Sequence, residues 1–389
     1  MSRGDGAALE FPDEAQYWAM AKSLAASGGL VDEFGFRATR MPLFPNWLAI
    51  FAQTPRGVVF AKIAHLLIGA LCAVLTCGFA SALAGRRAGL LAGLLVALDP
   101  FLIFFSSLLL TEVVFTTALI ALWWTTWPLV SRDAVPPKIR RWLAVAAMAT
   151  LCVHLRESSL GLIALTLVFT LACRRFDRNA WMGTIIVGGV VVASLVPWAA
   201  RNKSVTGHWT WLTNRAGISL YDGVGPQATG ASNLADLQQM PAVAELDETE
   251  WNRYFLDASF RAIRSDPSRI LNLAVVKVKR MWNPFPNVDT YQSSGVRFIS
   301  AAWAFPTFAL ALAGVFVLRS NDARHGFRTA VYLLLPALYL TALHSLFVGS
   351  VRYRLPAIPM LEILSAIALT ALWQRFSTKG RQRERDRSA

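Results

Sequence analysis

The chain has 389 residues, of which 55% are hydrophobic and only 16% are charged. A soluble globular domain carries roughly 25% charged residues, so this composition excludes an ordinary soluble protein and predicts an all-α polytopic membrane protein. The net charge of +14 does not indicate a nucleic-acid partner, because Lys and Arg concentrate in the short links between apolar runs. That distribution follows the positive-inside rule of membrane proteins.

Residues 1–57 form a mostly polar segment before the first long apolar run, and their pattern predicts two short helices. Pro12 and Asp13 open the first, whose apolar residues recur at helical spacing over 14–26 before the Gly28-Gly29 stop. The second begins near Pro45 and has the apolar character of a helix that lies on the membrane surface.

Apolar runs after residue 57 are the predicted transmembrane helices, about nine in this chain. A hydrocarbon core of roughly 30 Å takes about 20 helical residues to cross. The predicted spans cover 58–82, 88–104, 108–130, 141–155, 158–173, 181–200, 298–318, 329–348 and 355–373. The chain therefore divides into a first loop (1–57), spans (58–200), a central loop (201–297), further spans (298–373) and a basic tail (374–389).

The links between spans predict the orientation. Links after the first, third, fifth and seventh spans are rich in Lys and Arg, as is the tail, whereas the short links of the other side hold only Arg156, Arg352 and Arg354. The basic side is cytoplasmic by the positive-inside rule. Residues 1–57 and 201–297 are then extracytoplasmic, and the C-terminus is cytoplasmic.

That orientation requires the N-terminal segment to cross the membrane, yet no apolar stretch of about 20 residues precedes residue 58. We therefore expect that a first transmembrane helix is missing from this chain. Spontaneous translocation of a short N-terminal tail is the alternative.

The central segment 201–297 is mixed in character. A stretch rich in Gly and Asn, 217–233, precedes a predicted charged helix over 246–265 and a basic amphipathic helix over 267–282.

Two adjacent carboxylates, Asp13 and Glu14, stand at the start of the first predicted helix, just outside the membrane surface. The positive end of the helix dipole keeps such a carboxylate ionised, and an ionised carboxylate can accept a proton from a hydroxyl group. The alternative is that Asp13 is only a helix cap.

Glu112 lies one turn inside an otherwise apolar span, near its predicted outer end. An ionisable residue in such a position is costly and marks a functional site by default. Asp99, at the outer end of the preceding span, is followed by Pro100 and is the better candidate for a cap at a helix break.

Arginines gather at the same predicted face, against the positive-inside bias. The planar guanidinium group binds phosphate through two parallel hydrogen bonds. The candidates for binding a lipid phosphate are Arg40, Arg156, Arg201, Arg352 and Arg354. Contact with lipid headgroups is the alternative for any one of them.

Carboxylates and arginines at one membrane-level face suit sugar transfer from a lipid phosphate. A carboxylate base activates the acceptor hydroxyl, and cations neutralise the departing phosphate, so that no general acid is required.

With these residues the chain resembles the C-type multispanning glycosyltransferases, in the bacterial branch of protein O-mannosyltransferases, lipid A aminoarabinose transferase and core galacturonosyltransferases. The similarity extends over nearly the whole chain, in the expected order. It rests on Pro12-Asp13-Glu14 with Tyr17, on Arg40 to Pro45, on Leu110-Thr111-Glu112, on Pro197-Trp198 with Arg201-Asn202, and on Arg352 to Pro356.

The resemblance implies an inverting transfer on the extracytoplasmic side of the bacterial inner membrane, from a polyprenyl-phosphate sugar to a glycan, lipid or protein acceptor. It implies that Asp13 is the catalytic base and that Glu112 occupies the second acidic position. Glu14, Tyr17 and Asp99 are the residues that we expect to shape the site around the acceptor. The sequence indicates no cofactor and leaves a divalent metal open.

Two other classes compete with this interpretation. A transporter of lipid-linked sugars would place its ionisable residues at mid-membrane, in broken helices of paired repeats. A polysaccharide polymerase or ligase would also carry a large outer loop with arginines, but does not require the Pro-Asp-Glu motif in its first outer loop.

Overall fold

The computed structural model describes residues 9–131, 137–234, 240, 243, 245–321 and 325–388. These residues form helices and loops and contain no strand. The α-helices are α1 (Pro12–Ser27), α2 (Leu43–Ala52), α3 (Gly57–Ala84), α4 (Arg86–Leu98), α5 (Pro100–Ser106), α6 (Thr111–Val130), α7 (Ile139–Leu155), α8 (Ser159–Cys173), α9 (Arg178–Thr206), α10 (Ala216–Val224), α12 (Glu248–Ser265), α13 (Pro267–Met281), α14 (Ser294–Asn321), α15 (His325–Leu346) and α16 (Ile358–Ser388). The described residues also form the 3-10 helices η2 (Asp289–Tyr291) and η3 (Val351–Ala357).

The long helices confirm the all-α polytopic fold. Among the described residues, six helices are long and apolar enough to cross a membrane by themselves: α3, α6, α9, α14, α15 and the stretch from η3 through α16. The bent pair α4–α5 becomes a seventh span if its two parts, 57° apart, cross together. The fourth and fifth predicted spans correspond to the shorter helices α7 and α8, of 17 and 15 residues.

The bend between α4 and α5 follows from the residues at the break. Asp99 accepts a hydrogen bond from the backbone N–H of Leu102 at 2.8 Å, which caps α5, and Pro100 occupies the first position of that helix. Proline lacks an N–H and suits the first turn. Asp99 is therefore an N-terminal helix cap, as the following Pro100 predicted.

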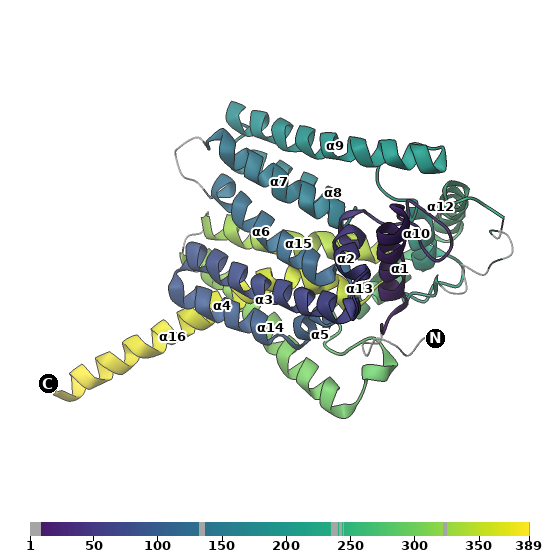
Figure 1. Ribbon diagram of the computed structural model, residues 1–389. Helices are drawn as coiled ribbons and strands as arrows, with labels where there is room; N and C mark the ends of the chain where they lie inside the picture. Colours follow the sequence, from purple (N-terminus) through teal and green to yellow (C-terminus); the bar gives the residue numbers. More distant parts are fainter. Residues whose placement is uncertain are drawn as a thin grey trace.

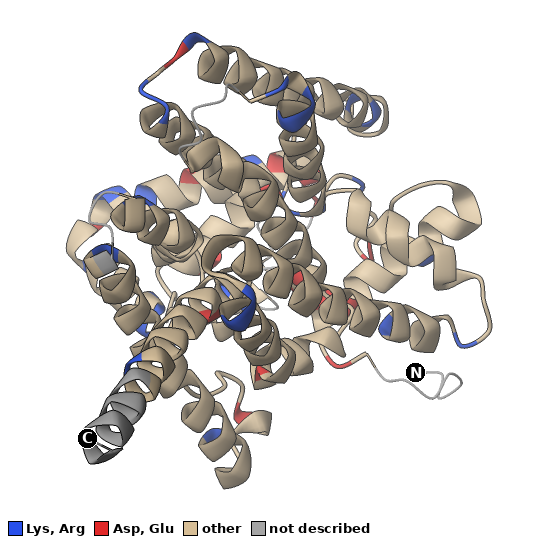
Figure 2. Cartoon of the chain, turned by 90° about the vertical axis from the view of Figure 1, so that its left-hand side faces the viewer, with Lys and Arg blue, Asp and Glu red and all other residues tan. Residues whose placement is uncertain are grey.

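The bundle has two distinct ends. In Figure 1, α1, α2, α10, α12 and α13 gather at one end, and the C-terminal part of α16 projects from the other. Figure 2 views the bundle from this second end, where blue Lys and Arg segments mark several helix ends and links. We call the first end, built by α1, α2, α10, α12 and α13, the capped end.

Both predicted helices of the N-terminal segment are present. Helix α1 starts at Pro12 and stops at Gly28, whose φ of 74° is the left-handed conformation that glycine adopts without strain. Helix α2 starts two residues before Pro45 and buries Phe44 and Leu48.

The central segment contains the two predicted helices, as α12 and α13, and one helix that the sequence pattern did not indicate, α10. Ile218 of α10 packs in a buried cluster with Trp251 and Phe255 of α12. Lys277 of α13 is fully buried and donates to the carbonyl oxygens of Ser345 and Leu346 at 3.2 and 2.6 Å. These carbonyls end α15, so a cation stabilises the negative end of that helix and joins α13 to it.

Candidate active site

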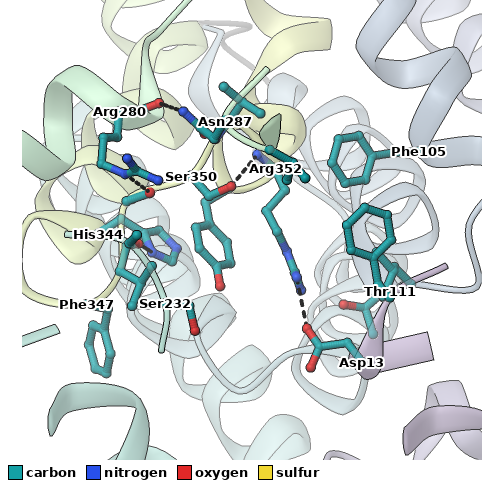
Figure 3. A pocket seen from close by; sticks show the side chains of 18 of the residues that line it. Asp13, Phe105, Thr111, Ser232, Arg280, Asn287, His344, Phe347, Ser350 and Arg352 are labelled. Atoms are coloured by element: carbon teal, nitrogen blue, oxygen red, sulfur yellow. Dashed lines mark hydrogen bonds and ion pairs between the residues drawn. The ribbon is translucent and has the colours of Figure 1, made fainter. Parts of the chain in front are cut away.

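A cavity of about 800 Å³ opens at the capped end of the bundle (Figure 3). It lies between the start of α1, the α5–α6 link, α10, the link from α13 to α14, the end of α15 and η3. Its walls therefore combine residues from segments 1–57 and 201–297, which were both predicted to lie outside the membrane, with the ends of several long helices.

Asp13 points into this cavity and is held by arginines from three distant parts of the chain. Its Oδ1 lies 2.5 Å from Arg40 Nη2 and 3.8 Å from Arg215 Nη2, and its Oδ2 lies 2.9 Å from Arg352 Nη1. Two of these three cations, Arg40 and Arg352, were predicted site residues.

Arg352 connects the two candidate catalytic carboxylates. While its Nη1 contacts Asp13, its Nε donates to Glu112 Oε1 at 2.9 Å. Arg156 Nη1 lies 3.5 Å from the same Glu112 oxygen. Glu112 is fully buried, and among the described residues its Oε2 has no hydrogen-bond partner.

Burial and the three neighbouring arginines shift the pKa of Asp13 in opposite directions. Removal from water raises the pKa of a carboxyl group, but the guanidinium groups of Arg40, Arg352 and Arg215 outweigh it and hold the pKa of Asp13 well below its usual range. Asp13 is therefore a carboxylate, and in this arrangement its negative charge is shared among strong hydrogen-bond donors.

Arg40 is fixed by the first turns of α1. It donates to Gln16 Oε1 through Nε at 2.8 Å and through Nη2 at 2.6 Å, and its Nη1 donates to the Tyr17 hydroxyl at 3.3 Å. Its guanidinium carbon also lies 4.7 Å from the centre of the Tyr17 ring. Burial raises the pKa of Tyr17, so its hydroxyl is protonated at neutral pH.

Glu14 lies beside Asp13 in sequence but does not line the cavity. Its Oε2 accepts from the backbone N–H groups of Glu10 and Phe11 at 2.8 and 3.1 Å, and its Oε1 accepts from Leu109 N at 2.8 Å. Glu14 therefore joins the start of α1 to the link before α6, close to Glu112.

Arg201 and Arg354, two predicted phosphate ligands, are also absent from the cavity wall. Arg201 donates to the carbonyl oxygens of Arg37 and Leu30. Arg354 is almost fully buried and donates to the carbonyl oxygens of Met281 and Asn283 at 3.1 and 2.5 Å. The structure places both arginines among loop carbonyls, where they hold segments together.

Three further residues of the wall were not identified from the sequence: Arg215, Arg280 and His344. Arg215 and Arg280 lie in the central segment, where no sequence motif distinguishes them from the other basic residues. His344 belongs to an apolar helix. Only the tertiary fold brings these three residues to the cavity wall.

The charges of the wall do not cancel. Among the described residues, five arginines line the cavity against three carboxylates: Arg40, Arg156, Arg215, Arg280 and Arg352 against Asp13, Glu157 and Asp222. With Glu112 buried behind this wall, one positive charge remains in excess. The described residues contain no group of three or more His, Cys, Asp or Glu side chains that could hold a metal ion.

The fold defines the class of this protein: it is a multipass membrane protein with the fold of the C-type glycosyltransferases. The chain is similar to the archaeal oligosaccharyltransferase AglB from Archaeoglobus fulgidus, both in its complex with an inhibitory peptide and a dolichol-phosphate (TM-score 0.57) and in its apo form (TM-score 0.59). Sequence identity is 13% in both cases. The alignments cover 98% and 96% of this chain but 49% and 48% of the other, so the chain spans about half the length of that protein.

A weaker similarity connects the chain to ArnT from Cupriavidus metallidurans, with a TM-score of 0.41, 14% identity, and coverage of 92% of this chain and 73% of that one. No protein-family model matches the chain, and no curated protein sequence does. The similarity to AglB confirms the resemblance to the C-type multispanning glycosyltransferases at the level of the fold. The assignment to their bacterial branch stays a prediction.

Proposed function

We propose that this protein is a membrane glycosyltransferase that transfers a sugar from a polyprenyl-phosphate donor to an extracytoplasmic acceptor, with inversion at the anomeric carbon. The observation that carries the proposal is the position of Asp13, an ionised carboxylate surrounded by arginines in a large cavity beside the membrane-spanning helices. The carboxylate supplies a base, and the cations supply a place for an anionic leaving group.

Arg280 is the best candidate for the first contact with the donor phosphate. Its Nε donates to the carbonyl oxygen of Gly349 at 3.3 Å, and among the described residues no carboxylate forms an ion pair with it. The other four arginines of the wall already face carboxylates.

The apolar side of the cavity supports a lipid carrier. Phe101, Phe104 and Phe105 of α5 line it, as do Val296 and Ile299 of α14. The last two are also 38% and 59% exposed, so the apolar lining continues from the cavity to the outer surface of the bundle. A prenyl chain lying along this surface stays in the lipid while its phosphate enters the cavity.

The reaction follows from this placement. The acceptor hydroxyl oxygen attacks the anomeric carbon from the face opposite the phosphate, and its proton passes to Asp13. The bond between that carbon and the phosphate oxygen breaks, and its electron pair leaves with the polyprenyl phosphate, whose growing charge the arginines stabilise. A phosphate that draws Arg352 and Arg40 toward itself weakens their hold on Asp13 and makes this carboxylate a better base.

The proposed orientation places the capped end on the extracytoplasmic side of the plasma (inner) membrane and the C-terminus in the cytoplasm. It rests on the basic links of the opposite end. The AglB complex, which holds a dolichol-phosphate and a peptide, supports a lipid phosphate and a separate acceptor as ligands of this fold. For this chain, we propose a glycan, lipid or protein as the acceptor.

The test is transfer or release of sugar by the purified protein in lipid vesicles, with a panel of polyprenyl-phosphate sugars. We expect the wild type to consume at least one donor, Asp13→Asn to lose at least about a hundredfold in rate because the base is gone, and Glu112→Gln to lose less. Asp257→Asn, on the exposed face of α12, is the matched control and should act like wild type. Consumption of a donor by Asp13→Asn at the wild-type rate would contradict the mechanism.

A further inference from the structure

The proposed reaction gives no role to three polar or aromatic residues of the cavity wall, Ser232, His344 and Phe347. In Figure 3, Asp13 and Thr111 lie on one side, whereas His344, Ser232 and Phe347 lie on the other. His344 belongs to the last turn of α15 and is 8% exposed, at the cavity wall.

The hydrogen bonds of His344 fix its tautomer. Its Nδ1 lies 3.0 Å from the carbonyl oxygen of Val348. A carbonyl oxygen can only accept, so Nδ1 carries the proton, and in the neutral imidazole Nε2 then carries the lone pair. No hydrogen bond from the described residues reaches this Nε2. A hydrogen-bond acceptor at such a position is destabilised unless a ligand or water satisfies it.

The ring of His344 is held in place by aromatic stacking. It lies parallel to the Tyr353 ring, with centroids 4.0 Å apart and an interplanar angle of 11°. Arg352 lies over the Tyr353 ring, 5.2 Å from its centre. The stacking holds the His344 ring, and with it the lone pair of Nε2, in one orientation. The ring contacts the segment that also carries Arg352.

The chemistry of this nitrogen selects the ligand. An unprotonated nitrogen accepts a hydrogen bond from an O–H or N–H group, whereas a phosphate or carboxylate offers no proton and would require a protonated ring, which would add a cation close to Arg352. The neighbouring wall is also polar: Asp222 accepts from the Ser232 hydroxyl at 2.7 Å. A molecule with several hydroxyl groups fits this surface.

We infer that Nε2 of His344 accepts a hydrogen bond from a hydroxyl group of a sugar in this cavity and thereby determines which sugars are used. The inference rests on the proposed function for the source of that sugar, which is either the transferred sugar of the donor or the acceptor glycan. His344 is then a specificity-determining residue, separate from the carboxylates and arginines.

Two substitutions separate this role from a structural one. In His344→Asn the amide nitrogen replaces Nδ1 and keeps the bond to Val348 but removes the acceptor in the cavity. In His344→Gln the amide oxygen lies near the position of Nε2. We expect His344→Asn to raise the KM of the sugar about tenfold with little change in kcat, and His344→Gln to retain most of the affinity. If the bond to Val348 were what matters, the order of the two variants would reverse, and the inference would be wrong.

Analogues of the sugar that lack one hydroxyl group identify the bond. The wild type should reject one deoxy analogue, and His344→Asn should lose that discrimination. Hydrolysis of a deoxy donor in the absence of acceptor tests whether His344 binds the sugar of the donor. Transfer to a deoxy acceptor tests whether His344 binds the acceptor. Equal discrimination by the wild type and His344→Asn against every analogue overturns the inference.

A spectroscopic readout distinguishes failure of this inference from failure of the proposed function. The chain has only 5 histidines, so ring ¹⁵N labelling gives few signals, and the spectrum of His344→Asn assigns the one of interest. We expect the Nε2 resonance to move when a donor or a free sugar is added. If it moves while no donor is consumed, the inference stands without the proposed reaction. If a donor is consumed and the resonance stays in place, the inference fails and the reaction stands.

Discussion

Arg352 links the two candidate catalytic carboxylates, Asp13 and Glu112. One guanidinium group contacts Asp13 through Nη1 and Glu112 through Nε, each at 2.9 Å. A lysine could not form this arrangement, because its single ammonium group lacks the planar fork. In the proposed reaction, Glu112 orients the cation that Asp13 shares with the donor phosphate. Glu112 does not line the cavity, so its proposed role is to position Arg352.

Arg280 is predicted to act on donor binding more than on the chemical step. Substitution Arg280→Gln removes a cation that has no carboxylate partner among the described residues, so the variant leaves no buried carboxylate unpaired. We expect the KM for the donor to rise roughly tenfold to a hundredfold, in line with the loss of a charge-assisted hydrogen bond.

The measurement is the initial rate at varied donor concentration, beside the control Arg264→Gln, which removes an exposed arginine of α12. A fall in kcat at unchanged KM would instead assign Arg280 to the transition state, and wild-type kinetics would remove it from the site.

At the scale of elements, α1 and the α5–α6 link form one unit through Glu14. Its carboxylate accepts three backbone N–H groups, two at the start of α1 and one from Leu109. In Glu14→Gln the new amide N–H₂ group can accept no hydrogen bond, so it leaves at least one buried donor unsatisfied. We expect a loss of about 1–3 kcal/mol in the free energy of unfolding.

Thermal unfolding in detergent tests this prediction, with Asp257→Asn as the control for the loss of one exposed acidic charge. An unchanged midpoint of unfolding would show that the three N–H groups find other partners. Because Asp13 precedes Glu14 in the same turn, activity should fall together with stability.

Helix α10 shows why sequence patterns missed one element of the site. Gly217, Gly223 and Gly225 lower the helix propensity of this stretch, so its composition indicates a loop. In the structure, a Cβ atom at Gly217 would come within 2.1 Å of the carbonyl oxygen of Asn252, and one at Gly223 within 2.4 Å of that of Leu346. These glycines allow α10 to lie against α12 and the end of α15, so tertiary packing overrides the local preference.

At the scale of the whole molecule, local signals predicted the helices, and distant contacts make the site. The Pro12 start and the Gly28 stop are read within a few residues of each other, and the structure confirms them. The apolar runs form helices, but among the described residues only six helices, or seven with the bent pair α4–α5, are long and apolar enough to cross a membrane, against nine predicted spans. In contrast, Arg352 and Asp13 are 339 positions apart, and Arg215 and Gln16 are 199 apart. No periodicity relates such positions, so the sequence offered candidate arginines but could not separate Arg352 at the cavity from Arg354 among loop carbonyls.

The orientation of the molecule is tested by labelling of introduced cysteines in intact cells. The native cysteines give a low background, because Cys72, Cys152 and Cys173 are buried and Cys77 is half-buried. Asp257→Cys, on α12 at the capped end, should react with a membrane-impermeant maleimide added outside. Arg375→Cys, on the exposed part of α16 at the opposite end, should react only after the cells are permeabilised. The physical reason is the preference of Lys-rich and Arg-rich links for the cytoplasmic side. The reverse labelling pattern would place the cavity in the cytoplasm, where Asp13 would meet a donor carried on the inner leaflet and an intracellular acceptor.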